Sequence, residues 1–168
     1  MRKFFNIFIV ILYLISPTQL YSIEQPVFKN LIIHKKPKIL ENFEFMTHEG
    51  DKVRLNDFNN KILVINFWAT WCAPCRDEMP SLDKLSKSKE FDNLIIIPIN
   101  IGEEKNKAEL FFKNTNIKNL KIFYDKNSVL AKKLALRGLP TTLLINKKGE
   151  EFSRIIGAAN FEDKKLSN

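Results

Sequence analysis

The strongest apolar patterns in the chain are two short continuous runs. Residues 62–68 read Ile-Leu-Val-Ile-Asn-Phe-Trp, and residues 94–101 read Leu-Ile-Ile-Ile-Pro-Ile-Asn-Ile. Both runs are rich in β-branched side chains and too short for an ordinary helix, so each predicts a strand buried on both faces of its sheet. We expect Pro98 near the end of its strand or at a bulge, because proline cannot donate to a strand ladder.

An amphipathic pattern follows the first run. Met79, Leu82 and Leu85 recur at helical spacing with polar residues between them, which predicts a helix from about residue 72 to 87. Pro74 suits the first turn of this helix, where its missing N–H costs nothing.

The remaining patterns complete an alternating α/β order. Apolar alternation on either side of Gly50 predicts a β-hairpin over residues 43–55. The other expected elements are helices over residues 102–114 and 129–136, the second capped by Asn127 or Ser128; strands over residues 121–124, 141–146 and 151–156; and a short last helix from Asn160 with Asp163 in its first turn.

The N-terminus carries the pattern of an export signal. Two basic residues precede an apolar run over residues 4–15, and polar residues then end it. Residues 1–22 therefore predict an export signal, or an uncleaved membrane anchor, since a tilted span needs about 17–25 mostly apolar residues. Proline and lysine in residues 23–40 predict a spacer, which leaves residues 41–168 as the folded domain.

Composition is consistent with one globular domain. The 168 residues are 45% hydrophobic and 27% charged, and 27 basic against 19 acidic residues give a net charge of +8. The lysines are scattered without a basic run or interleaved aromatic residues, which argues against nucleic acid and favours a solvated surface. Attraction to an anionic membrane surface stays open as an alternative.

The two cysteines of the chain, Cys72 and Cys75, lie at the start of the helix predicted over residues 72–87. Residues three apart on a helix face one another, so their sulfurs can form a disulfide with little backbone movement. Helix N-termini favour a thiolate and lower a thiol pKa from about 8.5 into roughly 3.5–7.5. We predict that Cys72 is the nucleophile and that Cys75 is the resolving thiol.

Two motifs give the chain a specific resemblance. Residues 66–80, Asn-Phe-Trp-Ala-Thr-Trp-Cys-Ala-Pro-Cys-Arg-Asp-Glu-Met-Pro, look like the active-site segment of thioredoxin-like proteins of the TlpA/ResA/DsbE group, and Gly-Leu-Pro-Thr-Thr at residues 138–142 resembles their second signature. The likeness runs from about residue 41 to the end. It implies an α/β thioredoxin-like fold, with a central mixed sheet flanked by helices, an N-terminal β-hairpin and a central helix–strand insert.

The resemblance also implies a docking surface. Leu139 and Pro140 match the cis-proline loop of the group, which would turn backbone edges of Leu139 and Thr141 toward an incoming peptide. Trp71 would form part of this surface, and its alternative role is core packing.

A proton-transfer group is implied by the same likeness. Typical thioredoxins have a buried Asp where Asn66 stands, and Asn66 cannot take up a proton. The ResA-like branch has a Glu three residues after the second cysteine, and Glu78 matches it. A partly buried Glu78 on the helix face of Cys75 would relay protons or tune thiolate formation. The alternative is a solvated Glu beside Arg76 and Asp77.

The function implied by the resemblance is that of an exported thiol-disulfide oxidoreductase that reduces envelope proteins without a metal or organic cofactor. A membrane-embedded thiol transporter would supply electrons, and apocytochrome c in cytochrome c maturation is the expected kind of substrate. The expected location is the cell envelope, periplasmic or on the outer face of the inner membrane. A general dithiol oxidant or isomerase is the alternative, because Ala73-Pro74 fixes no redox potential.

Other chemical classes fit the residues less well. A metal carrier would need His34 or His48 beside the two cysteines, and both histidines lie well before the motif. A peroxidase on this fold usually has Thr or Ser where Ala69 stands. Haem attachment would need a histidine after Cys75, and an arginine follows it. A non-catalytic binding module would leave the dithiol without a use.

Overall fold

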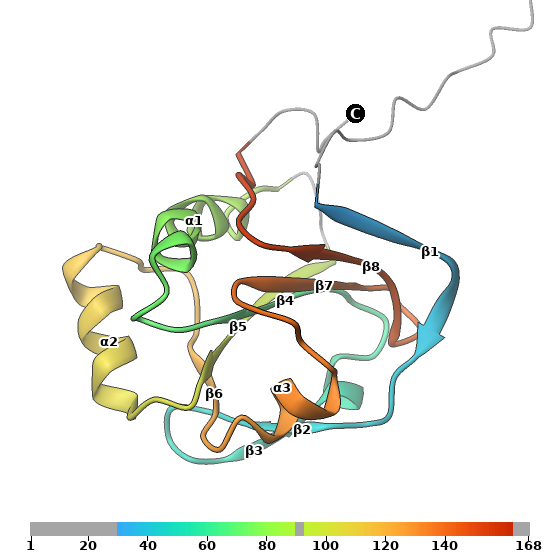
Figure 1. Ribbon diagram of the computed structural model, residues 1–168, viewed down its shortest axis with the longest axis horizontal. Helices are drawn as coiled ribbons and strands as arrows, with labels where there is room; N and C mark the ends of the chain where they lie inside the picture. Colours follow the sequence, from blue (N-terminus) through green and yellow to red (C-terminus); the bar gives the residue numbers. More distant parts are fainter. Residues whose placement is uncertain (1–29, 90–92, 163–168) are drawn as a thin grey trace, which may run out of the picture.

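The computed structural model describes residues 30–89 and 93–162, which form a mixed α/β layer (Figure 1). The strands are β1 (Leu31–Ile39), β2 (Glu44–Met46), β3 (Lys52–Arg54), β4 (Ile62–Trp68), β5 (Leu94–Ile101), β6 (Phe123–Asp125), β7 (Thr141–Ile145) and β8 (Glu150–Ile156). The α-helices are α1 (Ala73–Leu85), α2 (Lys105–Asn114) and α3 (Val129–Lys133), and a 3-10 turn covers Leu55–Phe58.

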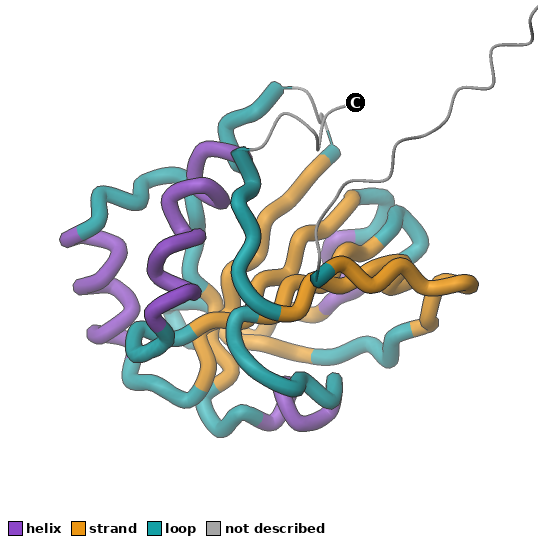
Figure 2. Tube along the Cα trace, turned by 45° about the horizontal axis from the view of Figure 1, so that its top comes forward, coloured by secondary structure: helices purple, strands orange, loops and turns teal. Residues whose placement is uncertain are grey.

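The eight strands form one sheet in the order β1-β8-β7-β4-β5-β6-β2-β3. β4, β5 and β6 run parallel, and the other strand pairs are antiparallel. Figures 1 and 2 show α1 and α2 together on one side of the strands, with α3 apart from them. The predicted thioredoxin-like architecture is therefore confirmed, including the leading hairpin and the inserted α2 and β6.

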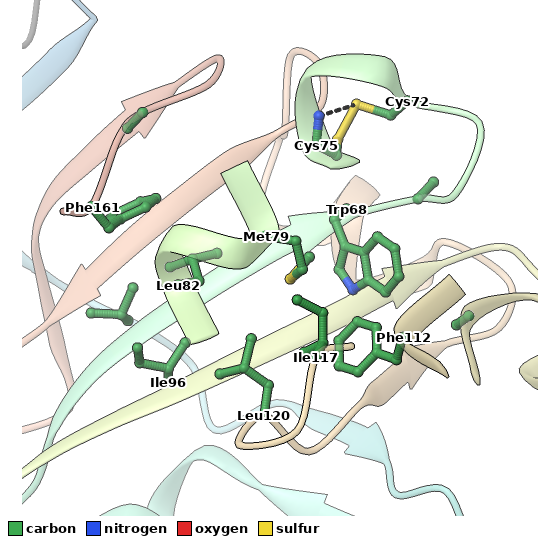
Figure 3. Close-up of a cluster of buried hydrophobic side chains, with 14 of the residues drawn as sticks. Trp68, Cys72, Cys75, Met79, Leu82, Ile96, Phe112, Ile117, Leu120 and Phe161 are labelled. Carbon is green, nitrogen blue, oxygen red and sulfur yellow. Dashed lines mark hydrogen bonds between the residues drawn. A yellow bond between two sulfur atoms is a disulfide. The ribbon is translucent and has the colours of Figure 1, made fainter. Parts of the chain in front are cut away.

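β4 is the centre of both hydrophobic clusters, as its continuous apolar pattern predicted. Leu63, Ile65 and Phe67 face the cluster that α3 joins, whereas Val64 and Trp68 face the cluster under α1 and α2. Figure 3 shows Met79 and Leu82 of α1 on this second cluster. Both side chains are fully buried, and each such burial contributes about 1.5–3 kcal/mol. This packing fixes α1, and with it the cysteines at its first turn.

Part of the predicted spacer is a strand. Residues 31–39 form β1, which pairs with β8 so that Leu31 lies opposite Ile155 and Ile39 opposite Glu150, with a shift in register between Ile33 and Lys38. The prediction of a spacer was wrong here because proline and exposed lysines also mark edge strands, where they prevent further strand pairing. The folded sheet therefore begins before residue 41.

Pro98 also differs from its prediction. It is the fifth of the eight residues of β5 and lies in regular register opposite Asn66 of β4, without a bulge. Pairing with β6 begins one residue later, where Ile99 lies opposite Phe123. The missing N–H thus falls where the ladder to β6 has not yet begun.

α3 is shorter than predicted and is capped differently. It ends at Lys133, and Ser128 precedes it in the left-handed region with a φ of 53° and no side-chain capping bond. Asp125 Oδ2 instead accepts from the Ala131 N–H at 2.9 Å. A residue at the end of β6 therefore takes the capping role that the sequence assigned to Asn127 or Ser128.

Two predictions fall outside the described residues. The export signal or anchor at residues 1–22 is one, and the last helix through Asp163 is the other. Within residues 30–89 and 93–162, no helix combines the length and apolar character that crossing a membrane requires.

Candidate active site

Cys72 and Cys75 form a disulfide at the N-terminus of α1, with an S–S distance of 2.03 Å (Figure 3). Cys72 is the N-cap residue, and its Sγ accepts from the Cys75 N–H at 3.3 Å. This N–H and the positive end of the helix would stabilise a thiolate at Cys72 after reduction. Cys72 keeps 5% of its surface exposed and Cys75 none. The difference supports the prediction that Cys72 attacks first.

The loop before the disulfide is held by Glu103, a residue that the sequence analysis missed. Glu103 Oε2 accepts from the Thr70 N–H at 2.6 Å, and Glu103 Oε1 accepts from Thr70 Oγ1 at 2.5 Å. Asn100 Nδ2 donates to Glu103 Oε2 at 2.8 Å, and Arg76 Nη1 donates to the Thr70 carbonyl at 2.8 Å. Because Glu103 is 33 residues from Thr70, no local sequence signal could have indicated this contact.

Trp71 is 68% exposed, directly before Cys72. The alternative role of core packing is therefore wrong for Trp71. Trp68 takes that role, since it is fully buried and stacks with Phe112 at a ring-centroid distance of 5.4 Å. Trp71 leaves a large apolar surface beside the disulfide.

The Leu139–Pro140 peptide bond is cis. Leu139 is half-buried against the cluster that contains both cysteines, so the two sequence motifs meet in space. Thr141 is only 1% exposed and lies in β7 between Phe67 of β4 and Ile156 of β8. The predicted free backbone edge at Thr141 is therefore wrong, because strands lie on both sides of this residue.

Glu78 is buried, with 4% of its surface exposed. Asn66 Nδ2 donates to Glu78 Oε1 at 2.8 Å, and the Ala159 N–H donates to Glu78 Oε2 at 3.0 Å. Burial raises the pKa of Glu78 to about 7, although both hydrogen bonds favour the charged form and oppose the rise. The alternative of a solvated surface Glu is wrong. A carboxyl group with this pKa can take up and release a proton at neutral pH.

Asn66 links Glu78 to the second motif. Asn66 is fully buried, and its Nδ2 also donates to Thr142 Oγ1 at 2.9 Å. Its Oδ1 has no hydrogen-bond partner among the described residues. Thr142 belongs to the Gly-Leu-Pro-Thr-Thr signature, but only the pairing of β4 with β7 shows which threonine contacts Asn66.

The two histidines considered as metal ligands each contact a carboxylate. His34 Nε2 lies 2.7 Å from Glu151 Oε1, and His48 Nδ1 lies 2.7 Å from Glu109 Oε1. Over residues 30–89 and 93–162, no group of three or more His, Cys, Asp or Glu side chains is arranged to hold a metal ion.

Comparison with known proteins agrees with this geometry. The AhpC/TSA family matches residues 38–150. The thiol-disulfide oxidoreductase ResA of Geobacillus thermodenitrificans is 34% identical over 115 residues, which cover 68% of this chain and 66% of that protein, just under two thirds of its length. The ResA of Bacillus cereus is 30% identical over 149 residues, covering 89% of this chain and 86% of that protein.

A solved structure shows the same fold. The crystal structure of a DsbF homologue from Corynebacterium diphtheriae superimposes with a TM-score of 0.70 and 26% sequence identity, covering 84% of this chain and 94% of that one. The chain therefore belongs to the AhpC/TSA family of thioredoxin-like proteins, and its predicted likeness to the TlpA/ResA/DsbE group is confirmed.

Proposed function

We propose that this protein is a thiol-disulfide oxidoreductase that exchanges its Cys72–Cys75 disulfide with cysteines of protein substrates. The observation that carries the proposal is a disulfide at the first turn of α1 whose first cysteine keeps 5% of its surface exposed and whose second is fully buried. The names of the ResA relatives support the same activity.

The proposed reduction runs in two steps. The Cys72 thiolate attacks one sulfur of a substrate disulfide, which forms a mixed disulfide and releases one substrate thiolate. Deprotonated Cys75 then attacks Cys72 Sγ, which forms the Cys72–Cys75 disulfide and releases the second substrate thiolate. Each released thiolate takes up a proton, so two electrons and two protons pass to the substrate.

Glu78 is the proposed proton acceptor for Cys75. It lies three residues after Cys75 on α1, and burial brings its pKa to about 7. A base is most effective when its pKa is near the working pH, because it is then partly deprotonated and still binds a proton well.

Trp71 and the Leu139–Pro140 loop are the proposed docking surface. Trp71 offers an exposed aromatic ring, and half-buried Leu139 contacts the cluster that holds the cysteines. Thr141 is buried and stabilises this loop, because its Oγ1 donates to the Gly138 carbonyl at 2.7 Å. In this proposal the substrate contacts Trp71 and Leu139, whereas Pro140, which is buried, bends the loop behind them, and Thr141 does not reach the substrate.

We further infer that the protein works as a reductant in the cell envelope, carried there or anchored by residues 1–22. A membrane-embedded thiol transporter would donate electrons, and apocytochrome c is the proposed kind of substrate. The basic start and apolar run of residues 4–15 and the likeness to ResA support this assignment. The folded domain that acts there includes β1 and so begins before residue 41.

A trapping experiment tests the exchange reaction. Reduced Cys75→Ser protein should form a stable mixed disulfide with oxidised insulin through Cys72, because the resolving thiol is missing. Dithiothreitol should release the adduct, and the Cys72→Ser/Cys75→Ser double variant is the matched control. Failure of the single variant to form any adduct would contradict the proposal.

The reduction potential tests the direction of transfer. Equilibration with glutathione redox buffers should give a value near that of thioredoxin, about −270 mV. A value near about −120 mV, typical of strong dithiol oxidants, would overturn the reducing role and favour the oxidant alternative.

A further inference from the structure

Residues 157–161 form a segment after β8 that we call the strap. The Gly157 N–H donates to the Pro140 carbonyl at 2.8 Å. Two residues later, the Ala159 N–H donates to Glu78 Oε2 at 3.0 Å. One short segment therefore supplies a hydrogen bond to the cis-proline loop and another to the buried carboxyl group.

The end of the strap is held by α1. The Phe161 N–H donates to Ser81 Oγ at 3.2 Å, and Ser81 Oγ donates to the Glu78 carbonyl at 2.7 Å. Phe161 is buried in the same cluster as Met79 of α1 (Figure 3). The strap is thus fixed at its C-terminal end by apolar packing.

The start of the strap is held by Asn30. Asn30 Nδ2 donates to the Ile156 carbonyl and to the Ala158 carbonyl, each at 3.1 Å. The Asn30 carbonyl accepts from the Ile156 N–H at 3.1 Å. Gly157, between the two carbonyls, has a φ of +96°, and a Cβ there would lie 3.5 Å from Asn30 Nδ2. Glycine is needed at this position because other residues rarely adopt such a φ.

The same peptide groups that accept from Asn30 make the two active-site contacts. The Ile156 carbonyl and the Gly157 N–H belong to one planar peptide group, and the Ala158 carbonyl and the Ala159 N–H belong to another. The Asn30 amide has two N–H donors, one for each carbonyl. Donation to a peptide carbonyl also polarises the N–H of the same group and strengthens the bond that it makes.

We propose that Asn30 is a positioning residue that directs the Ala159 N–H at Glu78 and the Gly157 N–H at Pro140. It acts through two peptide groups of the chain and touches neither the sulfurs nor the substrate. This inference rests on the proposed function, because Glu78 matters to catalysis only if it serves the dithiol.

The groups around Glu78 affect its pKa, which is the quantity that the loss of Asn30 should change. Glu78 lines a cavity of about 430 Å³ between α1 and the strap, together with the exposed carboxylates Asp77 and Glu162. Glu162 pairs with Lys84 at 2.9 Å. Among the described residues, β4 and β7 present the neutral side chains of Asn66 and Thr142 to this site, and α1 also carries Cys75.

The test is a titration of Glu78 in the oxidised full-length protein by carbon-13 NMR of the Glu side-chain carboxyl groups. The signal of Glu78 is identified by its loss in Glu78→Gln. Asn30→Ala should raise the pKa of Glu78 by about 0.5 to 1, because a weaker bond from the Ala159 N–H stabilises the carboxylate less. This readout does not depend on activity.

Ser153→Ala is the matched control. Ser153 Oγ donates to the Ile32 carbonyl at 2.9 Å, so this variant also removes a side-chain bond between β8 and β1 but leaves the strap untouched. The pKa of Glu78 should stay within about 0.2 of the wild-type value in this control. If both variants raise the pKa equally, or if neither does, Asn30 is not a positioning residue.

A second variant covers the case in which Asn30→Ala does not fold, as judged by circular dichroism. Asn30→Ser has a shorter side chain and at most one donor, so it cannot replace both amide bonds of Asn30, and the pKa of Glu78 should still rise above the wild-type value. An unchanged pKa in Asn30→Ser would then overturn the inference. Failure of the Cys75→Ser trap would overturn the proposed function instead, and it would leave the titration result standing.

Discussion

Two buried glutamates of this protein have opposite surroundings. Glu78 of α1 and Glu151 of β8 are 4% and 0% exposed. Glu151 accepts from Arg154 Nε at 2.6 Å and Arg154 Nη2 at 2.8 Å, and its Oε1 lies 2.7 Å from His34 Nε2. Glu78 accepts only from neutral groups among the described residues, the Asn66 amide and the Ala159 N–H.

The pKa values of the two groups move in opposite directions. Burial tends to raise the pKa of Glu151, but the hydrogen bonds and charges of Arg154 and His34 outweigh burial and hold it below its usual range. Burial raises the pKa of Glu78 to about 7, because neutral donors do not compensate for it. Two glutamates that are both buried thus differ in their partners: the one in β8 contacts Arg154 and His34 and has a lowered pKa, whereas the one in α1, three residues after Cys75, has a raised pKa.

The largest effect should come from Glu151→Gln. This variant leaves the Arg154 charge without its carboxylate, and breaking a buried ion pair costs about 3 to 5 kcal/mol of the free energy of unfolding. Urea unfolding at neutral pH measures the loss. Glu150→Gln, one residue away, is the control and should cost less than about 1 kcal/mol. A similar small loss in both variants would remove the contrast between the two glutamates.

The next effect is a pH dependence that comes from Glu78. Its pKa is about 7 when folded and 4.5 when unfolded, so the folded state holds the proton more tightly. The resulting stability is present below about pH 4.5 and is lost as the pH rises through about 7, a change on the order of 3 kcal/mol. Urea unfolding of the oxidised protein between about pH 5 and about pH 8 should show this fall.

Glu78→Gln is the control for this pH dependence. It should flatten the fall between about pH 5 and about pH 8, because the side chain is then neutral throughout. Glu151 has the opposite sign, since its pKa is lowered on folding and its contribution is lost only as the pH falls below the unfolded value of 4.5. If the free energy of unfolding of Glu78→Gln still fell over this pH range, the pH dependence would come from another titratable group.

A smaller effect is expected from Asn66→Leu. The leucine has a similar size but no amide donor, so the carboxylate of Glu78 loses one hydrogen bond and its pKa should rise by about 1 above the wild-type value. Carbon-13 NMR of the carboxyl group measures this change. Thr142→Val removes the other partner of Asn66 and leaves the donor to Glu78, so it should change the pKa much less. Equal changes in both variants would contradict the assignment.

The smallest effect should come from Arg154→Lys. Lysine keeps the charge beside Glu151 but loses the two-pronged contact of the guanidinium group, which should cost about 1 kcal/mol of the free energy of unfolding. The acid-induced loss of stability that belongs to Glu151 should remain in this variant. If Arg154→Lys destabilised the protein as much as Glu151→Gln, geometry rather than charge would hold this pair together.

Features of this protein that depend on neighbouring residues were predictable from one sequence. The apolar run over residues 62–68, the amphipathic pattern after it and Pro74 in the first turn were enough to predict β4, α1 and a disulfide between Cys72 and Cys75. The hairpins around Gly50 and Gly149 follow from turn residues in the same way. Periodicity and capping act over a few residues, so they are visible in one sequence.

Contacts between groups that are far apart in the sequence could be identified only from the assembled fold. Asn30 contacts Ile156 across 126 positions, His34 contacts Glu151 across 117, and Ala159 contacts Glu78 across 81. The placement of β1 beside β8 creates the first two contacts, and the strap after β8 creates the third. Strand order and register select such partners only when the whole sheet is assembled, and burial and neighbouring charge then set the pKa of each carboxyl group.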